Sequence, residues 1–432
     1  MNRSIKWVIA ISSILLITSI FYSVFRERDP YKYYTGLGSQ LAISENDEKM
    51  AFSYYLDGDE AIYTANADGT EVTKVSKEKD GRLHGPQFSD DGKQIVYLSE
   101  NNEDIQTLMM MNADGSEAKS ITTDRLHVTE AIFSPTSETV YFIAIPAVAA
   151  NKAEGETKEG YDLYSLDLNE TEAVQITDKD HFSMNDLSIS EDGTELYYSL
   201  FDEREQLYSY SVKEKKETKV AAVDGIKGDI YASIFSRGAK YLAYVAVSEE
   251  SKKESLFEYE LYSKNLETNE TKKLTELKSN IQSPVFFHQS DKIAFLHYEN
   301  WSSLPEEYQL MTVAVDGGDP KPIDLELPTA EKSHWFKKTI EYLFSDAVIS
   351  VYYIVLIGAV TIYLRLRSKR VFIPSIISLG LAVFLFIASF VVGSTMNPWF
   401  GIGLAMVSIA LFLCSLLLLL FAFVVKKVIK PL

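Results

Sequence analysis

The chain has 432 residues and is acidic, with 61 Asp and Glu against 42 Lys and Arg and a formal net charge of −19. This balance argues against a nucleic-acid partner, because polyanions bind basic surfaces. The single cysteine, Cys414, excludes an intrachain disulfide and a cysteine-rich metal cluster. All the acidic residues lie within 27–346, which hold only 32 of the basic ones.

The first predicted element is an apolar helix over Ile5–Phe25, preceded by Arg3 and Lys6. At ~1.5 Å per residue it is long enough to cross a bilayer. A secretory signal peptide has a similar composition, but no small-residue cleavage site precedes Arg26. We therefore expect residues 1–26 to be an uncleaved transmembrane anchor, followed by a linker over 27–35.

Residues 36–327 contain six copies of one pattern, in which an apolar pair, a polar turn and a strand rich in β-branched or aromatic residues follow one another. The turns are marked by Ser44, Ser89, Ser134, Ser190, Ser236 and His288. Spacings of 45 to 56 residues are typical of propeller blades with four short strands each. Pairs such as Asp68-Gly69 and Asp114-Gly115 suit hairpins that need positive φ. The pattern predicts an all-β, six-bladed β-propeller.

These repeats resemble those of the TolB-like β-propeller family, which has WD40-like repeats. The resemblance rests on Phe88-Ser-Asp-Asp-Gly and Phe133-Ser-Pro-Thr-Ser, and the turns with Arg237-Gly238 and Gln289-Ser-Asp depart from it. It implies a scaffold that binds proteins or small ligands, and it informs the fold more than the role. Some members are regulatory domains of peptidases. This chain has no hydrolase, phosphate-loop or metalloprotease motif, so we expect no enzyme activity and no cofactor.

Polar residues recur in the predicted connectors between blades, which gather around one mouth of the central channel. Imidazole and carboxylate groups that converge there would suit a metal ion or a polar ligand. The alternative is that these residues form no common site. Connectors are polar in any case, and the three histidines do not occupy equivalent positions in their repeats. The candidates are His84, His127, Glu130, His181, Asn185, Asp229 and Asn280.

Three loops on the same predicted face are long, at residues 146–160, 248–258 and 299–308. Long loops on a rigid scaffold often carry binding residues. Trp301 in the last loop is either a contact anchor for a partner or a cap on the neighbouring blade. Strand direction also predicts that both linkers leave from this face, which would then look toward the membrane. A strand exchanged between the ends of the ring would move the first exit.

Residues 328–346 are predicted to form a juxtamembrane helix, since Trp335, Phe336, Ile340 and Leu343 make one apolar stripe. A plain extension of the next span is the alternative. Residues 347–432 contain three further apolar runs, which predict a three-helix transmembrane domain. The basic segments Arg365–Arg370 and Lys426–Lys430 place both termini in the cytoplasm and the propeller outside.

Taken together, these patterns predict a four-span protein of a bacterial cell membrane with an extracytoplasmic propeller. We expect a non-enzymatic protein-binding or scaffold module whose partner is a membrane or envelope protein. The alternative is a ligand- or metal-sensing propeller, or a domain acting on cell-wall glycans, that uses the channel mouth. Oligomeric state is not indicated.

Overall fold

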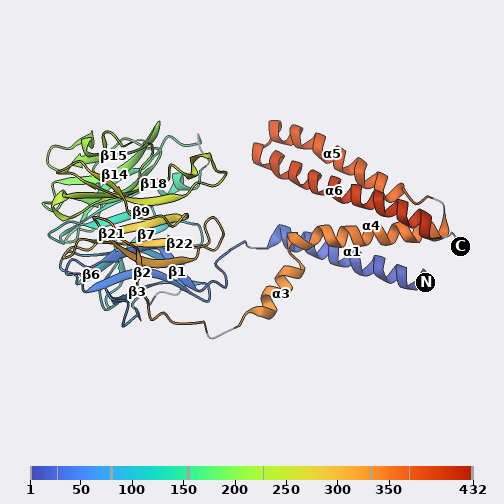
Figure 1. Ribbon diagram of the computed structural model, residues 1–432, viewed down its shortest axis with the longest axis horizontal. Helices are drawn as coiled ribbons and strands as arrows, with labels where there is room; N and C mark the ends of the chain where they lie inside the picture. Colours follow the sequence, from blue (N-terminus) through green and yellow to red (C-terminus); the bar gives the residue numbers. More distant parts are fainter. Residues whose placement is uncertain are drawn as a thin grey trace. The chain divides into compact units, whose positions relative to one another are not determined.

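The computed structural model describes residues 2–26, 28–77, 81–152, 156–226, 228–330, 333–368 and 370–429. The chain forms two compact units. One, the propeller, spans Pro30–Glu331, and the other, the helical unit, combines Met1–Asp29 with Lys332–Leu432 (Figure 1). Of the predicted juxtamembrane segment, Glu331 and Lys332 lie outside the described residues.

The propeller consists of six antiparallel sheets, each built from four consecutive strands. The first three blades are β1 (Gly36–Ile43), β2 (Lys49–Leu56), β3 (Asp59–Asn66) and β4 (Thr73–Lys74); β5 (Arg82–Phe88), β6 (Gln94–Glu100), β7 (Gln106–Asn112) and β8 (Lys119–Ser120); and β9 (Leu126–Phe133), β10 (Thr139–Pro146), β11 (Asp162–Asp167) and β12 (Val174–Gln175). The last three are β13 (Met184–Ile189), β14 (Glu195–Asp202), β15 (Arg204–Ser211) and β16 (Lys216–Lys219); β17 (Tyr231–Phe235), β18 (Tyr241–Val247), β19 (Tyr259–Asn265) and β20 (Thr271–Lys273); and β21 (Asn280–Phe286), β22 (Lys292–Tyr298), β23 (Tyr308–Ala314) and β24 (Lys321–Pro322). The predicted six-bladed fold is confirmed.

The repeated serine closes the turn between the first two strands of a blade. The Ser89 hydroxyl accepts a hydrogen bond from the Gln94 amide at 2.9 Å and donates to Asp91 at 2.8 Å. Ser190 does the same with Glu195 and Asp192. The next residue of the pattern is Gly92, at φ 69°. The Ser-x-Asp-Gly pattern is therefore a turn whose polar groups satisfy one another.

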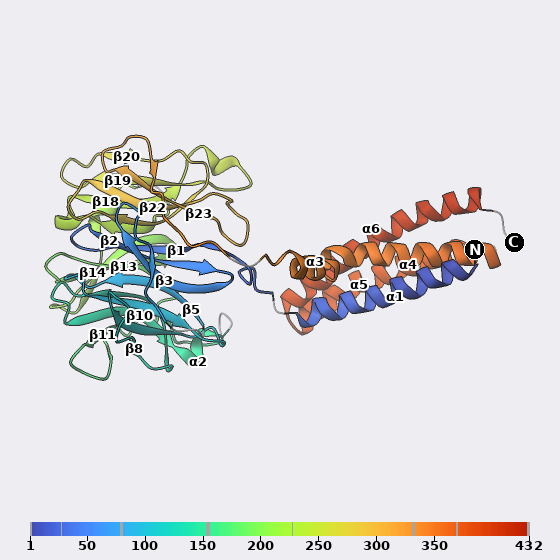
Figure 2. The same ribbon diagram turned by 90° about the horizontal axis from the view of Figure 1, so that it is seen from below.

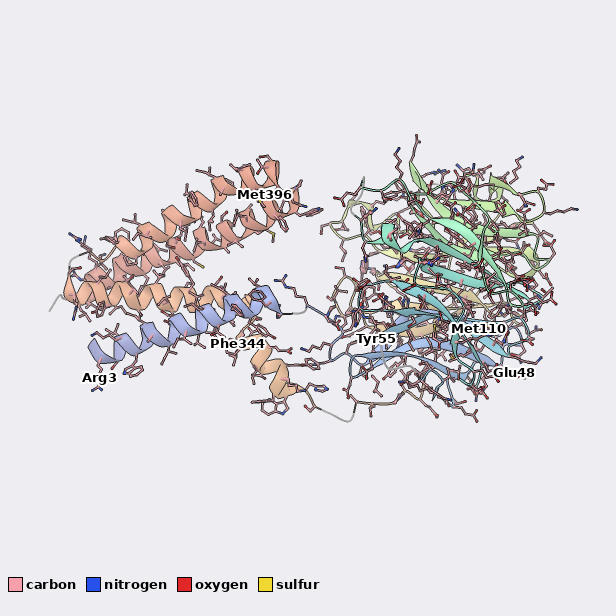
Figure 3. All side chains as sticks on the ribbon, turned by 180° about the vertical axis from the view of Figure 1, so that it is seen from behind. Arg3, Glu48, Tyr55, Met110, Phe344 and Met396 are labelled. Atoms are coloured by element: carbon pink, nitrogen blue, oxygen red, sulfur yellow. The ribbon has the colours of Figure 1, made fainter. Side chains whose placement is uncertain are left out.

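These turns define one face of the propeller, the turn face, at residues 44–48, 89–93, 134–138, 190–194, 236–240 and 287–291. The opposite loop face carries the connections between second and third strands and those between blades. Figure 3 labels Glu48 on the turn face and Tyr55 at the opposite end of β2. Three connections on the loop face are long: 147–161, which contains the short helix α2 (Ala147–Ala150), 248–258 and 299–307.

The ring closes between β1 and β21 without a strand exchanged between its ends, since each described sheet uses consecutive strands (Figure 2). Side chains join the two blades instead. The Asp47 carboxylate accepts the His288 and Gln289 amides at 2.7 and 2.8 Å. The Ser283 hydroxyl accepts the Leu41 amide at 3.0 Å.

The chain ends of the propeller also bind blades one and six, which meet where the ring closes. After β24 the chain returns along this blade, where the Glu326 amide bonds to the Gly69 carbonyl at 3.2 Å and the Tyr54 hydroxyl to the Pro328 carbonyl at 2.6 Å. At the other end, the Tyr31 hydroxyl donates to the Glu306 carboxylate. Since Tyr54 lies near the loop-face end of β2 and Glu306 in a loop of that face, both chain ends leave the propeller there.

The helical unit contains α1 (Asn2–Phe25), α3 (Trp335–Leu343), α4 (Asp346–Arg367), α5 (Ile373–Thr395) and α6 (Pro398–Val428). All but α3 are apolar and long enough to cross a membrane. The short helix begins at Trp335, seven residues after the start of the predicted 328–346 segment, and a break at Phe344–Ser345 separates it from α4. It is therefore a distinct helix and no extension of the span.

Buried hydroxyl groups tie three of the spans together. The Tyr353 hydroxyl of α4 donates to Ser378 of α5 at 2.6 Å, and Ser378 shares a 2.5 Å hydrogen bond with Ser415 of α6. Within this unit both termini lie at one end (Figure 1). The basic loop lies there too, since the Arg365 guanidinium donates to the Ile429 and Lys426 carbonyls.

Candidate functional site

The inner strands of all six blades surround a cavity of about 580 Å³ in the central channel. It reaches from near the turn-face ends of these strands, at residues such as Gln87 and Ser188, to Trp301 on the loop face. A cavity of this volume is in the range of small-molecule sites.

Most of the inner strands carry a bulge where they line this cavity. The pairing of β13 with β14 shifts between Asn185 and Ser188, and β17 and β21 shift at equivalent places. The bulges contain Asp186, Ala232 and Ser283 at φ 61°, 47° and 47°. Positive φ strains residues other than glycine, so something must hold each bulge in place.

Carboxylates from the preceding blade hold two of these bulges. Glu130 of β9 accepts the amides of Asp186 and Leu187 at 3.0 and 2.6 Å. Asp186 in turn accepts the Ser233 amide of β17 at 3.4 Å and the Ser199 hydroxyl at 2.8 Å. Desolvation in the channel, followed by the charge of Asp186, raises the pKa of Glu130 to about 7 despite these amides. Desolvation also raises the pKa of Asp186.

A third carboxylate, Glu205 of β15, lies in the cavity wall. Its pKa is raised first by desolvation and then by the charge of Asp186. Among the described residues that line the cavity, none is Lys, Arg or His. The wall is therefore negative wherever these carboxyl groups ionise.

Arg237 links three blades at the turn face. Its Nε donates to Glu191 of blade four at 2.7 Å, and another guanidinium nitrogen pairs with Glu45 of blade one. Blades one and five are not neighbours in the ring, so this side chain reaches past blade six. The departure of the fifth repeat from the usual turn thus places a cation where three other repeats have Glu45, Asp90 and Glu191. The cavity itself extends to Tyr259 and Trp301 at the loop face.

Four of the eight predicted site residues line the cavity: Glu130, Asn185, Asn280 and Trp301. Asp229 lies beside it, where its carboxylate accepts the Glu205 amide at 3.0 Å. The three histidines do not converge on the cavity. His181 instead bonds to Glu217 of the outermost strand of blade four at 3.0 Å.

His84 and His127 lie near Glu100, outside the cavity wall. Burial lowers the pKa of both imidazoles, and the Glu100 charge opposes it. His127 Nδ1 accepts the Gln106 amide at 3.3 Å, which is a structural role. No group of three His, Cys, Asp or Glu in the described part of the chain is placed to hold a metal ion.

Trp301 joins blade six to blade five. Its indole N–H donates to the Phe257 carbonyl at 2.8 Å, and its ring meets Tyr259 edge-on at 5.8 Å. The side chain therefore caps the neighbouring blade and stays partly exposed at the cavity, and its role as a contact anchor for a partner stays a prediction.

Large apolar side chains are exposed on the loop face, where they come from blades three to six. Val148 is 78% exposed, Phe182 69% and Leu304 65%. We call this set the apolar rim, and its members are Val148, Phe182, Phe201, Leu256, Phe257 and Leu304. Val174, on the outermost strand of blade three, is the other large apolar side chain of the propeller exposed to this degree in the described residues.

Sequence reasoning missed Asp186, Glu205, Arg237 and most of the rim. Arg237 carried a usable signal, since it replaces the acidic turn residue of other repeats. Asp186 and Glu205 carried none, because a bulge on one strand and a turn on another bring them to the channel.

No protein-family description and no curated protein matches the chain. Solved structures do. TolB from Acinetobacter baumannii is 16% identical with a TM-score of 0.49, covering 63% of this chain and 62% of its own. An oligogalacturonate lyase from Vibrio parahaemolyticus is 14% identical, with a TM-score of 0.47, over 70% of this chain and 81% of its own.

A prolyl endopeptidase is 11% identical with a TM-score of 0.48, over 76% of this chain and 55% of its own. At these identities the likeness concerns the fold alone. The chain spans less than two thirds of the TolB and endopeptidase chains that it matches. The protein is a six-bladed β-propeller whose described residues also form four apolar helices long enough to span a membrane.

Proposed function

We propose that the protein is a membrane-anchored, non-enzymatic binding module of the bacterial cell envelope. Its loop face docks the extracytoplasmic part of another membrane protein. The observation that carries this proposal is the apolar rim, because exposed apolar side chains that gather on one face mark interaction sites in soluble domains. The rim lies on the loop face of a rigid scaffold, where binding loops are commonly found.

The helical unit supports the assignment to a membrane and an orientation in it. Its basic residues Arg365, Lys426 and Lys427 gather at the end that also holds both termini. By the positive-inside rule this end is cytoplasmic. With four spans, the propeller is then extracytoplasmic.

The chain ends support a membrane-proximal loop face. The Tyr31 and Tyr54 contacts fix both chain ends at this face. Only the stretch from Pro328 to Trp335 separates the second contact from α3. A partner in the same membrane is therefore within reach of the rim, whereas the acidic propeller would be repelled by anionic lipid headgroups.

The propeller fold leaves enzyme activity open, since solved propellers of similar fold include a lyase and a peptidase. A non-enzymatic role is supported by two of the channel carboxylates, Glu130 and Asp186, which accept backbone amides of the bulges. Glu130, for example, uses both oxygens on backbone amides.

Purification of the full-length protein from its own membranes in mild detergent tests the proposal. Two variants are compared with the parent: a rim variant with Val148, Phe182, Phe201 and Leu304 each changed to Ser, and Val174→Ser as the exposed control. We expect a membrane protein at near-equal amount with the parent and the control, and its loss from the rim variant. Retention by the rim variant, or no companion in any preparation, would overturn the proposal.

A further inference from the structure

The channel cavity has features that the docking of a protein at the rim does not use. Three carboxylates, Glu130, Asp186 and Glu205, lie in its wall, and no cationic side chain of the described lining neutralises them. They come from β9, β13 and β15, so the ring brings together charges that are up to 75 residues apart in the sequence. A negative, partly desolvated wall favours a cation.

The same wall holds hydroxyl groups without a hydrogen-bond partner among the described residues. Ser188 is 9% exposed and Ser233 3% exposed, and neither Oγ is bonded. Gln40 Oε1 and Thr129 Oγ1, also in the lining, are likewise unbonded. Buried polar atoms are costly to leave unsatisfied, so a ligand that donates hydrogen bonds to these four groups would offset that cost.

Aromatic rings form the wall on the side of blades five and six. Tyr231 and Tyr259 meet edge-on at 5.7 Å, and Tyr259 meets Trp301 edge-on at 5.8 Å. All three line the cavity. Ring faces attract ammonium groups and the C–H groups next to them.

We propose that the channel cavity binds a small organic cation that carries a primary ammonium group. The carboxylates compensate its charge, the free hydroxyl and amide oxygens accept its N–H groups, and the aromatic wall covers its carbon skeleton. A metal ion is the poorer fit, because the described residues bring no three metal-binding side chains together. Amino sugars and aliphatic diamines share this chemistry, and the test separates them.

Trp301 provides a reporter at the site. The chain has four tryptophans, so changing Trp7, Trp335 and Trp399 to Phe in the full-length protein leaves Trp301 alone. In non-ionic detergent at constant ionic strength, its fluorescence is titrated with glucosamine and 1,4-diaminobutane. The neutral counterparts are N-acetylglucosamine and 1,4-butanediol. Calorimetry on the parent protein gives the stoichiometry.

We expect a saturable, one-to-one response to at least one amine and none to its neutral counterpart. The amine that binds more tightly shows whether the ligand is an amino sugar or an aliphatic diamine. Glu205→Gln and Asp186→Asn each weaken binding about tenfold, and Glu103→Gln, an exposed carboxyl on the same face, leaves it unchanged. Circular dichroism checks the fold of each variant. If Asp186→Asn does not fold, the affinity of Glu205→Gln alone decides the outcome.

Equal binding of the neutral compounds would overturn the proposal. So would the absence of a saturable response to both amines up to about 10 mM, or an unchanged affinity in a folded Glu205→Gln. None of these results bears on the apolar rim, which is tested by copurification.

Discussion

The Glu130 carboxylate of blade three accepts the Asp186 backbone amide of blade four at 3.0 Å. Asp186 is the strained residue of its own bulge, at φ 61°, and its carboxylate accepts the Ser233 amide of blade five. Blades three to five are thus linked around the channel by one repeated device. Each acidic side chain replaces hydrogen bonds that the bulge removes from the sheet.

Removal of the Glu130 side chain should therefore destabilise the propeller. Glu130→Ala leaves two amides without acceptors, and we expect a loss of about 1–3 kcal/mol in the free energy of unfolding at pH 7.5. Glu130→Gln keeps one carbonyl acceptor and should lose less. Thermal unfolding by circular dichroism checks this, with Glu103→Ala as control. An equal effect of Glu130→Ala and Glu103→Ala would contradict the bulge account.

The buried carboxyl of Glu60 predicts a pH dependence. Desolvation raises its pKa from 4.5 to about 7, against the opposing hydrogen bonds of Tyr55 and Ser53. The folded state therefore holds a proton that the unfolded chain releases between these values. The contribution of this carboxyl to stability is full below about pH 4.5 and is lost as the pH rises through about 7.

Glu60→Gln should remove that loss, because the amide stays neutral and still accepts hydrogen bonds. We expect the variant to unfold at a higher temperature than the parent at pH 8. Its free energy of unfolding should be greater by at most about 3 kcal/mol, and this difference should close toward pH 5. Melting curves across this range check it. A difference that does not change with pH would show that Glu60 is ionised throughout.

The contact between Gly69 and the returning chain predicts a contrast between two glycines. Both Gly69 and Gly92 have positive φ, at 93° and 69°. A Cβ on Gly69 would lie 2.1 Å from the Asp324 carbonyl oxygen, whereas one on Gly92 meets nothing within 4 Å. Gly92→Ala should cost about 1 kcal/mol, and Gly69→Ala about 1–3 kcal/mol more. Equal melting temperatures would mean that residues 323–328 do not pack closely against Gly69.

Substitutions of Arg237 test how much its ion pairs stabilise the turn face. Its pairs with Glu45 and Glu191 are partly exposed, so Arg237→Ala is expected to cost about 1 kcal/mol or less. Arg237→Glu places three carboxylates together and should cost more. Salt should narrow the gap between the two variants, because it screens exposed charges. Urea unfolding at low and high salt measures it, and a gap insensitive to salt would contradict this assignment.

Much of the fold was predictable because it repeats. Ser44, Ser89 and their equivalents occupy one turn each, so their spacing revealed the blades. The helix begins at Trp335, the first residue of the apolar stripe, whereas the predicted segment began at residue 328; its start was not predictable because His334 makes no side-chain capping hydrogen bond. The site was predicted in part. Glu130 and Asn185 line the channel, but His181 bonds to Glu217. Each connector runs from the outermost strand of one blade to the innermost strand of the next, so only its last residues face the channel.

The central claim, that the loop face docks a membrane protein, is tested most directly by site-specific photocrosslinking in living cells. A photoreactive residue replaces Phe182 or Leu304 of the rim, and Val174 or Glu48 as controls away from it. We predict that both rim positions crosslink to the same membrane protein and that the controls do not. Crosslinks of equal yield from Val174 and Glu48, or none from either rim position, would contradict the account.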